Sequence, residues 1–164
     1  MKKSILSFVF VLAFATVASA APRFGVIGEQ TNGLGAFITD DMYNAQVLFS
    51  NSSNDATAKT EGSKITAGAN YKIALDSVTA LTAGVNYSTT SGKSLGVDIE
   101  TNTTLAVSAG FERALSSNIV LTTQADIYSQ NTQKYKANNF SLPTTDEKTT
   151  KLFSNGRVGV AYLF

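Results

Sequence analysis

The chain has 164 residues, with 13 Lys or Arg, 12 Asp or Glu, and no His or Cys. Histidine and cysteine supply the usual general base, the usual zinc ligands and the thiolate nucleophile, so their absence predicts a protein that is not an enzyme and has no metal or cofactor site. The near-balanced charge gives no electrostatic reason to expect nucleic acid as a partner. Disulfides are excluded as well.

Residues 1–20, MKKSILSFVFVLAFATVASA, have the pattern of a secretory signal peptide. Two lysines precede an apolar run, and the small residues Ala18 and Ala20 follow it. The alternative is a transmembrane anchor, but the run is too short to cross about 30 Å of hydrocarbon as a helix. We therefore expect cleavage after Ala20 and a single domain over residues 21–164.

The rest of the chain alternates with a period of two rather than with helical spacing. In SKITAGANYKIAL, for example, Ile65, Tyr71 and Ile73 fall on one face, while Lys64 and Lys72 fall on the other. The alternation predicts eight strands, the first two of marginal length for a membrane crossing. They are expected near residues 23–31, 34–39, 42–50, 63–74, 79–89, 102–114, 119–132 and 149–164.

An internal repeat supports this division. YKIALDS, residues 71–77, recurs as FERALSS, residues 111–117, and each copy ends a strand at a short turn. Chance similarity at common turn residues is the alternative explanation. Short turns at 40–41, 76–77 and 116–118 alternate with the longer polar segments 51–62, 88–101 and 131–148, and an Asn32-Gly33 hairpin signal joins the first two strands. Short turns on one side and longer loops on the other are typical of an eight-stranded antiparallel up-and-down transmembrane β-barrel.

The C-terminal VGVAYLF carries a resemblance to a known family. The sequence resembles the small outer-membrane β-barrel proteins of Gram-negative bacteria, of the OmpA-transmembrane-domain and OmpX type, which end on an aromatic residue preceded by apolar residues at alternate positions. The resemblance implies that Val158, Val160, Tyr162 and Phe164 form the signal that the barrel-assembly machinery reads, with periplasmic chaperones as further partners during biogenesis. No peptidoglycan-binding domain follows the barrel, so cell-wall attachment is not implied.

The two faces of the strands have different chemistry. A charge at the bilayer midplane costs about 2–4 kcal/mol for Lys or Arg, so the apolar face is expected outside, in contact with outer-membrane lipid and lipopolysaccharide. The charged face is expected to fill the lumen with Glu29, Lys64, Lys72, Glu112, Asp126 and Arg157. Aromatic residues near the turn side of their strands are expected to form a periplasmic girdle, although strand propensity alone also enriches aromatics. They are Tyr43, Tyr71, Phe111, Tyr162 and Phe164.

An eight-stranded barrel has an interior just wide enough for side chains to fill it. The sequence therefore predicts a monomeric, multi-pass outer-membrane protein with both termini periplasmic, a largely plugged lumen, and a structural or surface-interaction role. Two alternatives remain open at this stage: a narrow channel for small solutes, and a soluble periplasmic barrel of the lipocalin type, which would be apolar inside and polar outside.

Arg157 is the cation for which alternation predicts specific partners. Counting along the strands places Asp126 and Glu29 at a similar height on the two neighbouring strands, so that two carboxylates bracket the guanidinium. A shift of two residues along the tilted strands would place Asn155 or Gly159 at this level instead.

Overall fold

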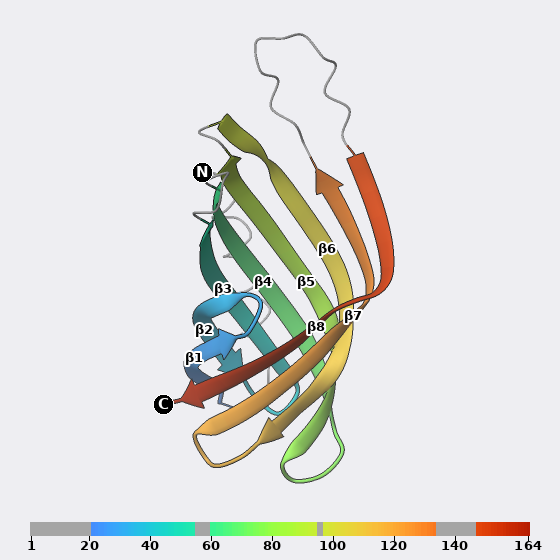
Figure 1. Ribbon diagram of the computed structural model, residues 1–164. Coiled ribbons are helices and arrows are strands. Elements are labelled where there is room, and N and C mark those ends of the chain that lie inside the picture. The colour runs from blue at the N-terminus through green and yellow to red at the C-terminus, as the bar shows by residue number, and fades with distance from the viewer. Residues whose placement is uncertain (1–20, 55–59, 95–96, 134–146) are drawn as a thin grey trace.

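The computed structural model describes residues 21–54, 60–94, 97–133 and 147–164. Eight antiparallel strands follow one another up and down, and β1 pairs with β8 to close the barrel (Figure 1). The predicted fold class is confirmed. Most strand positions agree with the predicted ranges within a few residues, but β3 to β6 extend further toward the longer loops. The strands are β1 (Arg23–Glu29), β2 (Gly33–Thr39), β3 (Tyr43–Asn54), β4 (Thr60–Ala74), β5 (Thr79–Ser94), β6 (Val97–Ala114), β7 (Ile119–Gln133) and β8 (Glu147–Leu163).

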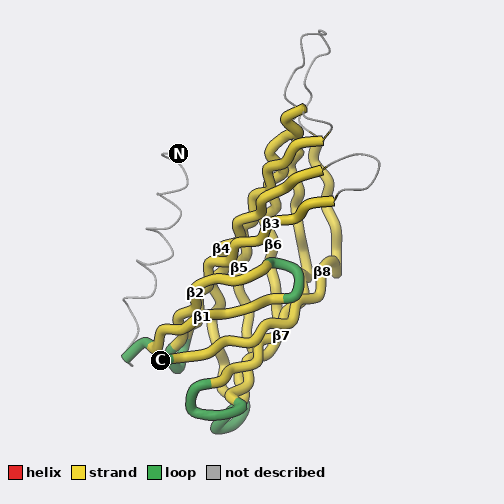
Figure 2. Tube along the Cα trace, turned by 60° about the vertical axis from the view of Figure 1, so that its left-hand side comes forward, coloured by secondary structure: helices red, strands yellow, loops and turns green. Residues whose placement is uncertain are grey.

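The barrel has two unlike ends (Figure 2). The turns 40–42, 75–78 and 115–118 lie at one end, together with the start of β1 and the C-terminus, and we call it the turn end. The opposite end, where β3 to β8 continue beyond the β1–β2 hairpin, is the loop end. The predicted loops 51–62, 88–101 and 131–148 belong to the loop end, and residues 55–59, 95–96 and 134–146 within them lie outside the described part of the chain.

The three turns at the turn end use the same side-chain device. The Oδ1 of Asp76 accepts hydrogen bonds from the amides of Val78, at 2.8 Å, and Thr79, at 2.7 Å. Asp40 accepts in the same way from the amides two and three residues on, as does the hydroxyl of Ser116. A short polar side chain that bonds its own backbone in this manner favours a turn. The repeat therefore marks two equivalent turns.

The same contacts act on the ionisation of Asp76. Its carboxylate is exposed at the turn end, and the hydrogen bond from the Val78 amide is the main cause that lowers its pKa. Hydrogen bonds to the charged form of a carboxyl favour that form. Asp76 is consequently a charged turn residue at neutral pH.

The outer surface of the barrel is apolar. Side chains such as Val85 on β5, Leu105 and Phe111 on β6, and Val160 on β8 are about half exposed. The buried residues are mostly polar, among them Thr66, Asn70, Asn86 and Ser108. This arrangement is opposite to that of a water-soluble lipocalin-like barrel, and it fits a barrel surrounded by lipid. No helix in the described part of the chain is long and apolar enough to span a membrane.

The two strands of the β1–β2 hairpin are shorter than the other six strands. β1 and β2 have seven residues each, whereas β4 to β8 have between 15 and 18. Gly33 opens β2 with a φ of 88°, which a glycine adopts without strain, and a Cβ there would meet the backbone of Phe49. β8 carries an extra residue opposite Ala125 and Asp126, and Phe153 and Asn155 have φ angles of 49° and 32° at this bulge.

Candidate functional site: the barrel lumen

An ion pair stands inside the barrel at the turn end. The Nζ of Lys72 on β4 donates to Oε1 of Glu112 on β6 at 2.5 Å, and both side chains are about nine-tenths buried. Thr39 and Asn44 donate to the two oxygens of Glu112, at 3.2 and 2.6 Å. We call these four residues the turn-end cluster. A buried pair with its remaining acceptors satisfied avoids the cost of an isolated charge.

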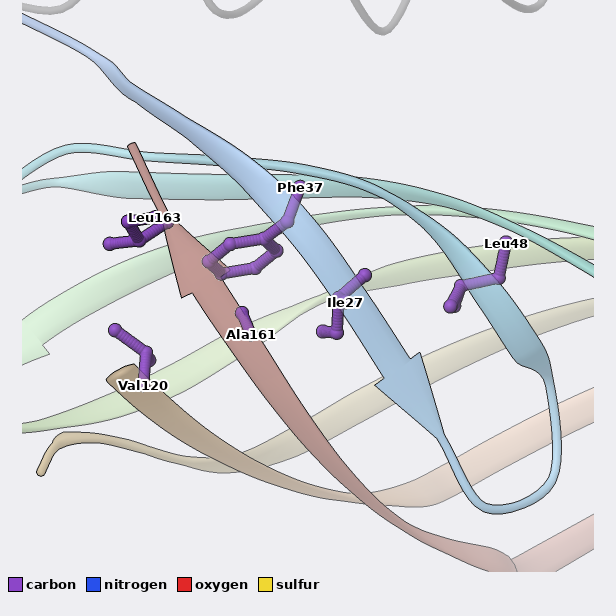
Figure 3. Close-up of a cluster of buried hydrophobic side chains, with 6 residues drawn as sticks. All are labelled: Ile27, Phe37, Leu48, Val120, Ala161 and Leu163. Carbon is purple, nitrogen blue, oxygen red and sulfur yellow. The ribbon is translucent and has the colours of Figure 1, made fainter. Parts of the chain in front are cut away.

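Beside this cluster the lumen is filled by apolar side chains. The apolar cluster comprises inward-facing residues of β1, β2, β3, β7 and β8, and Figure 3 shows them gathered between these strands. They are Ile27, Phe37, Leu48, Val120, Ala161 and Leu163, all at most 3% exposed. Close-packed side chains leave few voids as large as a water molecule. The turn-end half of the lumen is therefore occupied by an apolar cluster on one side and an ion pair on the other.

A second ion pair lies higher in the barrel. The guanidinium of Arg157 on β8 donates through Nη2 to Oδ1 of Asp126 on the adjacent β7 at 2.6 Å, and the two side chains are 7% and 4% exposed. The second oxygen of Asp126, Oδ2, accepts a hydrogen bond from the side-chain Nδ2 of Asn155 at 3.3 Å. Asp126 is therefore hydrogen-bonded both to Arg157 and to Asn155 in the bulge of β8. One of the two carboxylates expected beside Arg157 is in place.

Glu29 is not the second carboxylate beside Arg157. It faces Gly159 across the β1–β8 ladder, two residues from Arg157, and a Cβ on Gly159 would come within 2.9 Å of the Glu29 side chain. Its two oxygens instead accept from the side-chain amides of Gln46 and Asn32, each at 2.6 Å. The register places a glycine at this level, and the glycine leaves room for Glu29 to turn toward β3.

Asn32 links Glu29 to Lys64. It lies in the turn between β1 and β2 and is 2% exposed, and its Oδ1 accepts a hydrogen bond from Nζ of Lys64 at 2.6 Å. Arg157, Glu29 and Asp126 lie close enough for their charges to interact electrostatically with Lys64. We call Glu29, Asn32, Gln46, Lys64, Asp126 and Arg157 the upper cluster. All six charged residues expected in the lumen lie in one of the two clusters.

Sequence reasoning missed three kinds of lumen residue. Asn32 was interpreted only as a turn residue, and a turn that folds into the lumen has no local sequence signal. Asn44 and Gln46 alternate with the outward Tyr43, so the period of two could have identified them. The apolar cluster was also missed, because Ile27 and Leu48 are aliphatic and composition alone assigns such residues to the lipid face.

The aromatic residues expected in a girdle all lie on the outer surface near the turn end. Tyr43 and Tyr71 are directly paired across β3 and β4, with their rings edge to face at 5.4 Å. Tyr162 and Phe164 make a similar contact at 6.2 Å, and Phe111 is half exposed on β6. Edge-to-face packing is favourable for aromatic rings. The five residues thus share the outer surface of the turn-end half.

The chemistry available in this lumen is hydrogen bonding and charge pairing. Within the described residues no group of three acidic, histidine or cysteine side chains comes together as a metal site. Several buried polar atoms have no protein partner, including Oδ1 of Asn70 and of Asn86 and Nε of Arg157. Buried polar atoms are usually hydrogen-bonded, so we expect water molecules to bind them.

The closed ring of eight antiparallel strands, the apolar exterior and the polar interior define a small outer-membrane β-barrel. No protein-family model matches the sequence, and no curated protein is similar to it in sequence. Solved structures share its fold at low sequence identity. The chain is similar to neisserial surface protein A, with 17% identity, a TM-score of 0.51, and coverage of 87% of this chain and 96% of that one.

Two further barrels match with lower TM-scores. A major outer membrane protein from Thermus thermophilus is 15% identical, with a TM-score of 0.44 and coverage of 88% of this chain and 100% of that one. Ail, the attachment invasion locus protein of Yersinia pestis, is 14% identical, with a TM-score of 0.39 and coverage of 87% and 96%. The similarity to neisserial surface protein A shows the fold of the small outer-membrane barrels.

The upper ion pair predicts non-additive effects on stability. Replacing either partner, as Arg157→Met or Asp126→Ala, should lower the free energy of unfolding by about 3–5 kcal/mol, because each change leaves a buried charge unpaired. The double variant should lose less than the sum of the two, since it removes both charges. Denaturant unfolding of barrels in detergent or lipid vesicles measures these values. Lys151→Met, at an exposed position of the same strand, is the control, and additive losses would show that the pair is not coupled.

Proposed function

We propose that this protein is a non-enzymatic outer-membrane barrel with a structural or surface-interaction role and a lumen closed to solute flow. The observation that carries the proposal is the filling of the turn-end half of the lumen. Phe37, Val120 and Leu163 pack there, in the same half of the lumen as the Lys72–Glu112 ion pair. A barrel of eight strands has little interior volume to spare once side chains fill it. The absence of histidine and cysteine supports a role without catalysis.

Conductance tests the closed lumen against the narrow channel. Wild-type barrels in planar bilayers should show no steady current. Lys72→Ala combined with Glu112→Ala should produce openings, because the double change removes two side chains that fill the turn end. The matched control is Lys148→Ala, which truncates an exposed lysine at the loop end. Steady conductance by the wild-type barrel would contradict the proposal and favour the channel.

We further propose that the turn end faces the periplasm and the loop end faces the exterior. The support is the asymmetry of the barrel: outer-membrane barrels have short periplasmic turns and longer extracellular loops. Residue 21 and the C-terminus both lie at the turn end, so this orientation places both termini in the periplasm.

The absence of cysteine makes the orientation measurable by single-cysteine labelling. With a membrane-impermeant maleimide, Lys148→Cys should be labelled in intact cells, because position 148 is exposed at the loop end. Ser77→Cys is exposed at the turn end and should be labelled only after the outer membrane is permeabilised. The reverse pattern would show the opposite orientation.

Residues 1–20 remain a predicted signal peptide, and they lie outside the described residues. We propose that Phe164 and the apolar positions 158, 160 and 162 direct insertion by the barrel-assembly machinery. In the folded barrel Phe164 is 75% exposed on the outer surface, so little of the folded structure depends on its side chain. A requirement for this residue would therefore point to assembly rather than to stability.

Phe164→Ser should accordingly reduce the amount of folded, heat-modifiable barrel in the outer membrane while leaving synthesis and export unchanged. Phe153→Ser is the matched control, since it places the same change at an exposed aromatic of the same strand. Equal amounts of folded barrel from Phe164→Ser and wild type would exclude a role for Phe164 in assembly.

The partners that this role requires are outer-membrane lipid and lipopolysaccharide around the barrel, with the barrel-assembly machinery and periplasmic chaperones during biogenesis. The support for lipid as the surrounding medium is the apolar exterior between the turn-end aromatic residues and the exposed Leu152 and Phe153. We propose a monomer, because backbone pairing closes the barrel within one chain.

A further inference from the structure

The wall of the barrel is incomplete above the β1–β2 hairpin. The last ladder contact between β1 and β8 runs from the amide of Gln30 to the carbonyl of Val158, at 3.1 Å, and the last pair between β2 and β3 joins Leu34 to Phe49. Beyond these points residues 50–54 and 147–157 have no neighbouring strand on the hairpin side, as far as the described residues extend. We call this gap in the hydrogen-bonding ladder the notch. Figure 1 shows its two edges, β3 and β8, on opposite sides of the loop-end half.

The notch lies at membrane depth. A tilted strand needs about ten residues to cross an apolar band about 25 Å tall. The seven residues of β1 and of β2 reach about 18 Å at a rise of about 3.3 Å per residue and a tilt of about 40°. The notch therefore opens into the loop-end leaflet. Lipid tails cannot satisfy unpaired backbone amides and carbonyls, so these two strand edges require a polar occupant.

The floor of the notch holds a lysine that forms no ion pair within the described part of the chain. Asn32 lies at the tip of the hairpin. Lys64 on β4 is paired with Ser50 of β3, is half-buried, and donates a hydrogen bond to Asn32. Arg157 is the first residue of β8 beyond the reach of β1, and its buried Nε has no protein partner. Among the described side chains no carboxylate lies within ion-pair distance of Lys64. Asp126 is already paired with Arg157, and Glu29 is hydrogen-bonded to Gln46 and Asn32, so, as far as the floor is described, Lys64 is the cation that remains to meet an anion.

The rim of the notch is apolar and strained. Leu152 and Phe153 on β8 are 69% and 81% exposed, and Leu34 on β2 is 67% exposed. Phe153 and Asn155 adopt left-handed backbone conformations, which are strained for non-glycine residues and cluster at binding sites. The exposed Lys151 lies on the same strand. An apolar rim around a cationic, hydrogen-bonding floor matches an amphiphile with an anionic head.

We propose that the notch binds the phosphate-bearing headgroup of a lipid of the loop-end leaflet. The phosphate oxygens accept hydrogen bonds from Lys64 and Arg157, unpaired amides of β8 supply further donors, and the apolar part of the lipid contacts Leu152 and Phe153. This assignment rests on the proposed outer-membrane role and names the chemistry of one lipid site.

A second copy of the chain is the competing occupant. The β8 edges of two equally inserted copies run parallel, whereas the β3 edge of one copy and the β8 edge of another run antiparallel and could pair. The lipid headgroup is favoured because its phosphate supplies the negative charge that Lys64 lacks within ion-pair distance among the described side chains. A concentration-dependent dimer whose formation requires residues 150–157 would overturn the lipid assignment.

The experiment titrates the refolded mature barrel in detergent with three probes: diphosphorylated lipid A, the same lipid after removal of both phosphates, and inorganic phosphate. The wild type should bind the diphosphorylated lipid about tenfold or more tightly than the dephosphorylated one, the size expected for hydrogen bonds to a charged group. Lys64→Met should lose this difference and bind both lipids alike. Phe153→Gly should weaken both lipids equally and keep its fold, because glycine suits the left-handed conformation.

Arg113→Met is the matched control, since it removes one positive charge from an exposed position of β6 at the turn end. Its affinities for both lipids should equal those of the wild type. An equal loss of affinity in Arg113→Met and Lys64→Met would show that the effect depends on net charge alone and would overturn the proposed site. Competition by inorganic phosphate in the millimolar range would assign the floor to free phosphate instead. A wild-type barrel that inserts and stays closed but binds neither lipid would refute the notch proposal while leaving the proposed function intact.

Discussion

Backbone hydrogen bonding in an apolar medium is the constraint on which the rest of this barrel depends. Each strand within the hydrocarbon must give its amides and carbonyls to two neighbours, because lipid offers no partner. The pairing of β1 with β8 meets this requirement in the turn-end half. This pairing extends from Gly25–Leu163 to Glu29–Gly159. Above these pairs, as far as the chain is described, β3 and β8 have no neighbouring strand on the hairpin side.

The interior shows how a narrow barrel manages buried charge. The Lys72–Glu112 and Arg157–Asp126 pairs each join two strands, and neutral amides and hydroxyls satisfy most of the remaining oxygens. Removing one partner of a buried pair costs more than the pair itself contributes, so such pairs act mainly to fix the arrangement of strands. The apolar cluster around Phe37 and Leu48 stabilises the turn-end half without needing any partner.

The β8 bulge connects the two halves of the structure. It lies near the point where β8 loses β1 as a neighbour, and Leu152 and Phe153 beside it are exposed. Asp126 bonds both Arg157 below the bulge and Asn155 within it. Bulges commonly redirect side chains near functional sites. One carboxylate thus links the charge pair in the lumen with the geometry of the rim.

The sequence by itself determined the strand count, the faces of the strands and the turns. Each follows from local rules: alternation separates Ile65 from Lys64, and Asp76 and Ser116 bond their own backbones. Only the tertiary structure decided which lumen residues meet, because a strand's register cannot be read from its own sequence. A two-residue difference in register set Glu29 beside Gly159 and gave its oxygens to Asn32 and Gln46. The notch, likewise, depends on where β1 and β2 end relative to β3 and β8, and that relation exists only once the barrel is closed.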